Sequence, residues 1–129
     1  MSFLPIKTSL IAALHDASVE HFVFDAVRRR LLLTLLLDSD EGPSHRQQQV
    51  VFSGIRNGAE VQQLQRLIDA TLAAGKRLKL GYRLDEFCPL KQEASDYHEG
   101  RLSVRLVINY LPVLQLRCQK ITSQEVNLM

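Results

Sequence analysis

The sequence predicts one α+β domain, residues 1–129, made mainly of antiparallel strands with one long helix packed on the sheet or sandwich. Apolar and polar residues alternate in several short segments, as in strands, and residues 58–74 show the repeat of an amphipathic helix. Short turns join strands on both sides of that helix, which favours antiparallel pairing. The expected order is β-β-β-α-β-β-β, with about six strands in all.

The first predicted hairpin joins residues 18–25 to residues 29–38 through a tight connection at 26–28. Its second strand contains six leucines and one threonine between Leu31 and Leu37. The odd-numbered leucines share one face, and the even-numbered positions share the other. Because both faces are apolar, we expect both to be covered, one of them by the helix. The run is too short to span a bilayer, which needs roughly 20 apolar residues.

Three further segments surround this hairpin. A short helix is expected before it, at residues 8–14. Residues 39–46, which combine Asp, Gly, Pro and Ser, predict a loop after it. A third strand is expected at residues 47–55.

The helix at 58–74 has recognisable ends. Asn57 is expected to cap it, with Glu60 completing a capping box. Gly75 is expected to follow its last turn as the C′ residue. One apolar stripe would face the sheet, formed by Val61, Leu64, Leu67, Ile68 and Leu72.

The alternation resumes after the helix. Strands are predicted at 77–85, 101–109 and 113–121, with a polar loop at 86–100 between the first two. The last two strands form a second hairpin, and the tail from Thr122 is expected outside the sheet.

Basic residues lie opposite the apolar positions of these three strands: Lys79, Arg83, Arg105 and Arg117. If the strands adjoin, they form a basic stripe on the open face of the sheet, which we predict to be a partner-binding surface. An acidic protein or RNA could recognise it, although no outward aromatic residue is present for base stacking. A solvated face without a partner is the alternative.

Chemical motifs are sparse. His15 and Asp16 adjoin, and an aspartate can orient a histidine as a base, but neighbours on a strand seldom point at each other. The histidines lack metal-ligand spacing, Cys88 has no base placed beside it, and Cys118 is expected in the core. Phosphate-loop, dinucleotide and serine-hydrolase motifs are absent from the sequence. We therefore predict no catalytic residue, no metal and no cofactor.

The bulk properties indicate a compartment. A net charge of +2 is too small to indicate nucleic acid or an acidic membrane as the partner. The first residues lack the basic region of a secretory signal, so we expect a cytoplasmic protein with reduced thiols. A Cys88–Cys118 disulfide is the alternative for a secreted protein.

Scattered short signals suggest a family. Leu14-His15-Asp16 leads into the first strand, an aliphatic strand and a loop follow, and Val51-Phe52-Ser53-Gly54-Ile55 ends the third strand. The chain closes on Leu116-Arg117-Cys118. This succession resembles the small bacterial immunity-type proteins of polymorphic toxin systems. The resemblance implies a β-rich fold that binds a protein without catalysis.

The leading hypothesis is a non-enzymatic cytoplasmic protein-interaction module, an immunity protein if the resemblance holds. The second is a small-ligand carrier or enzyme, with His15, Asp16 and His98 as polar groups of a pocket between sheet and helix. The third is RNA binding through the basic stripe. Self-association through an exposed strand edge, giving a homodimer, is also open.

Overall fold

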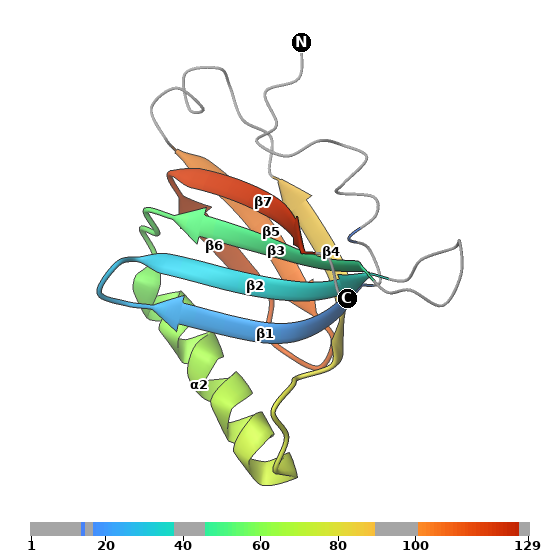
Figure 1. Cartoon of the computed structure of the whole chain (residues 1–129). Helices are drawn as coiled ribbons and strands as arrows, with labels where there is room; N and C mark the ends of the chain where they lie inside the picture. The colour runs from blue at the N-terminus through green and yellow to red at the C-terminus, as the bar shows by residue number, and fades with distance from the viewer. Residues whose placement is uncertain (1–13, 15–16, 38–45, 90–100, 127–129) are drawn as a thin grey trace.

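The computed structural model describes residues 14, 17–37, 46–89 and 101–126, and Figure 1 shows how its elements are arranged. The elements in chain order are β1 (Ser18–Asp25), β2 (Arg30–Leu37), β3 (Arg46–Ser53), α2 (Gly58–Gly75), β4 (Tyr82–Pro89), β5 (Leu102–Ile108), β6 (Leu114–Cys118) and β7 (Lys120–Val126). All paired strands are antiparallel, in the sheet order β6-β5-β4-β1-β2-β3-β7. The predicted α+β class and element order are confirmed.

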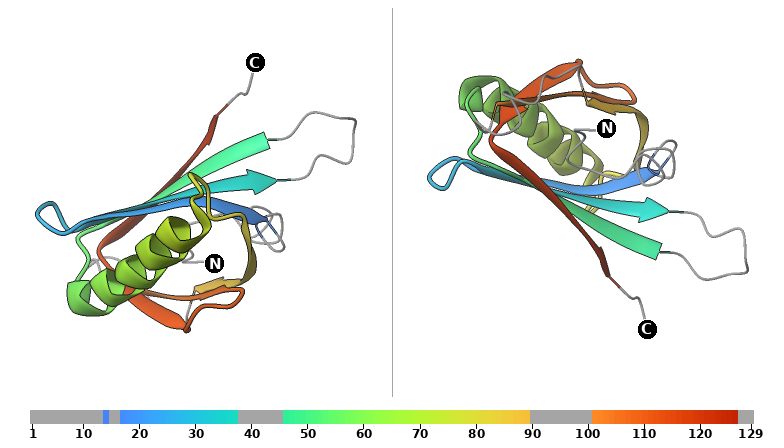
Figure 2. Two further views of the ribbon diagram at one scale, coloured as in Figure 1. Left: turned by 90° about the horizontal axis from the view of Figure 1, so that it is seen from below. Right: turned by 90° about the horizontal axis from the view of Figure 1, so that it is seen from above.

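The sheet bends into two layers, β1-β2-β3-β7 and β4-β5-β6, that enclose the core (Figure 2). They join where β1 pairs with β4 over only Ser18–Arg83 and Val19–Tyr82. β6 and β7 are consecutive in the chain but lie at opposite ends of the strand order, so the chain crosses between layers near Gln119. Across the core, the ring centroids of Phe52 and Phe87 are 6.1 Å apart.

Helix α2 packs mainly against β1 and β6, one strand from each layer. It therefore closes the side of the core where the two layers separate (Figure 2). Within the predicted stripe, Val61, Leu64 and Ile68 are buried and Leu72 is partly buried, whereas Leu67 is exposed. The helix thus packs on the sheet, as predicted, but chiefly on β1, which adjoins β2, and on β6 of the other layer, and not on β2 itself.

Both predicted helix ends need correction. The Asn57 side chain makes no capping hydrogen bond. Its Oδ1 instead accepts a hydrogen bond from the Arg117 N–H at 2.9 Å, and its Nδ2 donates to the Gln115 carbonyl at 2.6 Å. Asn57 therefore satisfies the outer edge of β6, where no further strand pairs among the described residues. At the other end, Gly75 remains helical and Lys76 is the left-handed residue, with φ +51°.

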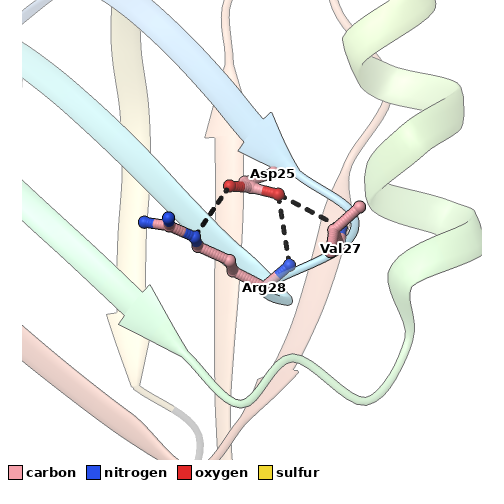
Figure 3. Close-up of polar contacts among 3 residues, drawn as sticks. All are labelled: Asp25, Val27 and Arg28. Carbon is pink, nitrogen blue, oxygen red and sulfur yellow. Dashed lines mark hydrogen bonds and ion pairs between the residues drawn. The ribbon is translucent and has the colours of Figure 1, made fainter.

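The first hairpin is confirmed, and one carboxylate holds its turn. Asp25 Oδ1 accepts hydrogen bonds from the N–H groups of Val27 and Arg28, both at 3.1 Å, as Figure 3 shows. Asp25 Oδ2 also lies 3.9 Å from Nε of Arg28. Arg29 has a φ of +53°, which lets the chain reverse into β2. A short polar side chain at the strand end thus stabilises the tight connection.

The two faces of β2 have different surroundings. The odd-numbered leucines, Leu31 to Leu37, are all buried in the core. On the other face Thr34 is buried and Leu32 and Leu36 are half-buried, and no described helix or strand lies over this face of β2 (Figures 1 and 2). A second helix or strand layer over this face, which the prediction of two covered faces implies, is not found among the described residues.

The segments after the helix are shifted from their predicted bounds. β4 begins at Tyr82 and not at residue 77, because Gly81 adopts a φ of +70° and breaks the extended chain. It then continues to Pro89, into the predicted loop. The predicted strand at 113–121 divides into β6 and β7, and β7 includes most of the tail that was expected outside the sheet.

Three predicted segments lie outside the described residues. These are most of the loops predicted at 39–46 and 86–100, whose described residues belong to β3 and β4, and the short helix at 8–14, of which Leu14 alone is described and is buried.

Candidate interaction surfaces

The outer face of β1-β2-β3-β7 carries no Asp, Glu, Lys or Arg across its central rows. The strand registers align its outward residues in three rows, which we call the uncharged face: Val23, Leu32, Val51 and Thr122; His21, Thr34, Gln49 and Gln124; Ser18, Leu36, Gln47 and Val126. Charged residues appear only one row further, where Asp25 pairs with Arg30 and Ser53 with Lys120.

The uncharged face presents aliphatic side chains to solvent. Val23 is 54% exposed, while Leu32, Leu36 and Val51 are half-buried among their neighbours. Solvent faces of antiparallel sheets are usually polar, and depletion of charge marks the centre of protein–protein interfaces. This face therefore has the composition of a binding surface.

The outer face of β4-β5-β6 has the opposite composition. Nε of Arg83 lies 2.8 Å from Oδ1 of Asp85, and Nε of Arg105 lies 3.4 Å from Oε2 of Glu86. Arg117 is exposed on β6. We call this surface the charged face. Its cations have carboxylates among them, so it is a mixed-charge surface and not a purely basic one.

The structure brings together two of the four predicted basic residues. Arg105 pairs with Gln115 and Arg117 pairs with Ser103, which makes the two arginines diagonal neighbours on β5 and β6. Arg83 lies toward the other end of this layer, opposite Ser18 of β1. Lys79 precedes β4 and belongs to no strand. The four therefore do not form one continuous stripe.

A groove separates β1 from α2, in the region where the second hypothesis places a pocket. Its volume is about 420 Å³. The lining residues come from both elements and from the segment before β4: Glu20, His21, Phe22, Val23, Phe24, Gln62, Gln65, Ile68, Asp69, Leu72 and Leu80. His15, Asp16 and His98, the polar groups expected there, lie outside the described residues.

The two cysteines lie in different environments. Cys88 is exposed on β4, and Cys118 is buried in the core as predicted. Burial raises the pKa of the Cys118 thiol from 9.0 to about 11, although the nearby charge of Arg56 and a hydrogen bond from the Lys120 backbone lower it. Both cysteines are reduced, so the alternative of a Cys88–Cys118 disulfide is not the arrangement seen here.

Other classes of site are limited by what the described residues contain. Among them, no group of three or more His, Cys, Asp or Glu side chains is placed to hold a metal ion. None of the described helices has the length and apolar character needed to cross a bilayer. No protein-family model, curated protein or solved structure matches this chain.

Sequence reasoning concentrated on the arginine-bearing strands and missed the uncharged face. One signal could have revealed it: Leu32 and Leu36 were assigned to a buried face because they are apolar. The same alternation that buries the odd-numbered leucines places these two on the outside. Val23 and Val51 then join Leu32 through the strand register, which sequence alone does not provide.

Proposed function

We propose that this protein is a non-enzymatic protein-interaction module that binds its partner through the uncharged face. The observation that carries the proposal is an open sheet face with aliphatic residues and no Asp, Glu, Lys or Arg in its three central rows. Burying charges without partners is costly, so a surface that lacks them is the one most readily covered by another protein.

The kind of partner follows from the sequence resemblance. We propose that the chain acts as an immunity protein in the cytoplasm, where it binds and neutralises a toxin encoded beside it. The succession Leu14-His15-Asp16, the aliphatic strand and Phe52-Ser53-Gly54-Ile55 supports this. RNA is a weaker candidate, because carboxylates adjoin Arg83 and Arg105 on the charged face.

Co-expression with the products of adjacent genes, followed by co-purification and calorimetry, tests the proposal. Val51→Lys places a charge in the centre of the uncharged face. Val107→Lys is the matched control, because Val107 is also a half-buried outward valine but lies on the charged face. We expect Val51→Lys to weaken binding at least about 100-fold and Val107→Lys to have little effect.

Two results would count against the proposal. The first is the absence of any complex with a neighbouring gene product. The second is a complex that Val51→Lys leaves intact while Arg105→Glu or Arg117→Glu disrupts it. The second result would place the interface on the basic residues predicted from the sequence and not on the uncharged face.

A further inference from the structure

The edge of β1 beside α2 is open over half its length. β1 pairs with β4 only at Ser18 and Val19. Just beyond, the Leu80 N–H donates to the Glu20 carbonyl at 3.0 Å. From Phe22 onward, no described strand pairs with this edge, and the groove between β1 and α2 lies against it.

Backbone polar groups of β1 point into this groove. The Phe24 N–H donates to Oε1 of Gln65 on α2 at 2.8 Å, so it faces away from β2. Residues two positions apart on an antiparallel strand present their N–H and C=O groups on the same side. Phe22 therefore also directs its backbone groups toward the groove. Because the Gln65 amide already accepts from the Phe24 N–H, an added strand would pair at Phe22 and would have to displace Gln65 to pair at Phe24.

The side chains of the groove favour a cation. The Glu20 residue is only 8% exposed, yet its carboxylate has no hydrogen bond or ion pair among the described residues. No fully buried side-chain oxygen in this part of the chain lacks a partner, so the Glu20 oxygens must reach solvent, and Glu20 lines the groove. Asp69 adds a second carboxylate, which accepts a hydrogen bond from Nε2 of Gln65 at 2.9 Å.

No lysine or arginine lines the groove to balance these two carboxylates. His21, Gln62 and Gln65 also line the groove, and the rest of the lining is apolar: Phe22, Val23, Phe24, Ile68, Leu72 and Leu80. A carboxylate that meets solvent only through such a groove is favourably paired with a cation that also donates hydrogen bonds. An occupant that pairs with the β1 backbone, packs on the apolar lining and neutralises a carboxylate has an extended backbone, apolar side chains and one basic group.

We propose that the groove binds an extended segment of a protein partner, which adds a strand to the open edge of β1 and places a lysine or arginine beside Glu20. This inference rests on the proposed function, because the added strand belongs to the protein partner. Strand addition is a recurrent mode of peptide recognition, in which backbone hydrogen bonds supply affinity and side-chain pockets supply specificity. An added strand would also enlarge the layer that carries the uncharged face.

The test begins with a displayed library of random linear peptides of about ten residues, long enough for one strand. Enriched peptides are synthesised with and without N-methyl groups at alternate positions, which remove the donors needed for strand pairing. We expect enriched sequences to alternate in polarity and to contain lysine or arginine. Peptide binding should slow hydrogen exchange of the Phe22 amide. N-methylation of the peptide on the side that pairs with β1 should abolish this binding.

Protein variants separate this site from the uncharged face. Glu20→Gln should lower the affinity for the unmodified peptide by about tenfold or more, since the substitution removes the charge of the side chain and keeps its shape. His21 and Val23 belong to both surfaces, but Val51 does not line the groove, so Val51→Lys should leave peptide affinity unchanged within about twofold. Circular dichroism of Glu20→Gln checks that the fold is intact.

Several outcomes would overturn the inference: no enrichment, enriched peptides without basic residues, unchanged exchange at Phe22, or full affinity in Glu20→Gln. A concentration-dependent dimer that protects the Phe22 amide without peptide would do so too, because the occupant would be a second copy of the chain. If Val51→Lys disrupts the partner complex while the peptide results fail, the proposed function stands and this inference does not. If the peptides behave as expected and Val51→Lys has no effect on the partner, only the uncharged face is excluded.

Discussion

The two layers of the sheet bury similar apolar residues on their inner sides and differ in their outer sides. Beneath β1-β2-β3-β7 lie side chains such as Leu33 and Phe52, and beneath β4-β5-β6 lie Leu106 and Leu116. On the outside, the first layer carries no Asp, Glu, Lys or Arg across three rows, whereas the second presents Arg83 with Asp85 and Arg105 with Glu86.

The contrast indicates which outer face of the sheet a protein partner would cover. Exposed charges keep a surface hydrated, and each must be desolvated or paired before a partner can cover it. The charged face meets the expectation for a solvated sheet surface, and the uncharged face does not. The outer composition of each layer, more than its total charge, therefore indicates where a protein partner would bind.

The largest expected effect tests which side of β2 is the core. Leu33→Asp should unfold the protein, because an unpaired buried carboxylate costs several kcal/mol and domains of this size have only about 5–15 kcal/mol of stability. Leu32→Asp, one residue away on the uncharged face, should remain folded. Circular dichroism and urea unfolding measure both. A folded Leu33→Asp variant, or an unfolded Leu32→Asp variant, would show that the two sides of β2 are wrongly assigned.

A smaller effect tests the inner side of the charged layer. Between pH 9 and pH 11 the Cys118 thiol loses its proton in the unfolded chain but keeps it in the fold, because burial raises its pKa from 9.0 to about 11. The folded state then binds more protons, so stability falls as pH rises, by at most about 2–3 kcal/mol from this group. Urea unfolding across this pH range should show the decline, and Cys118→Ala should remove that part of it. Equal slopes in the two proteins would mean that Cys118 is not sealed in the core.

The link between the layers is the next test. Asn57→Ala removes both hydrogen bonds to the edge of β6 and should lower the free energy of unfolding by about 1–3 kcal/mol. Asn57→Asp keeps the acceptor for the Arg117 N–H but turns a carboxylate oxygen toward the Gln115 carbonyl and the Glu60 carboxylate, so its loss should be at least as large. Urea denaturation measures both variants. A loss well below about 1 kcal/mol in Asn57→Ala would mean that these two hydrogen bonds do not stabilise the edge of β6.

The smallest effect is expected on the charged face. Arg105→Ala should change the free energy of unfolding by less than about 1 kcal/mol, because its ion pair with Glu86 is half-exposed and screened by solvent. A double-mutant cycle with Glu86→Ala isolates the pair, and the same variants should bind the protein partner normally. A coupling well above this range, or loss of the partner, would remove the functional distinction between the two faces.

Local patterns were sufficient for most of the fold. The helix at 58–74 was predicted to within one residue of its end at Gly75, and each strand of the first hairpin to within one residue at either end, because period and turn residues are properties of neighbouring positions. Errors arose where tertiary contacts compete with local preference. Asn57 bonds to β6 and leaves the helix end uncapped by its side chain, and Gly81 delays β4 to Tyr82.

Sequence by itself determined that this chain forms antiparallel strands with one amphipathic helix and that the leucine segment supplies much of the core. Tertiary structure decided which face of that segment stays open, which strand neighbours it, and where β1 is left without a partner. The physical reason is the sequence separation of the residues involved. Alternation is a local pattern that specifies the two sides of a strand, but not what lies over either side. That depends on residues such as Val51 and Gln65, which are distant in sequence and meet β2 and β1 only after the sheet bends and α2 packs beside it.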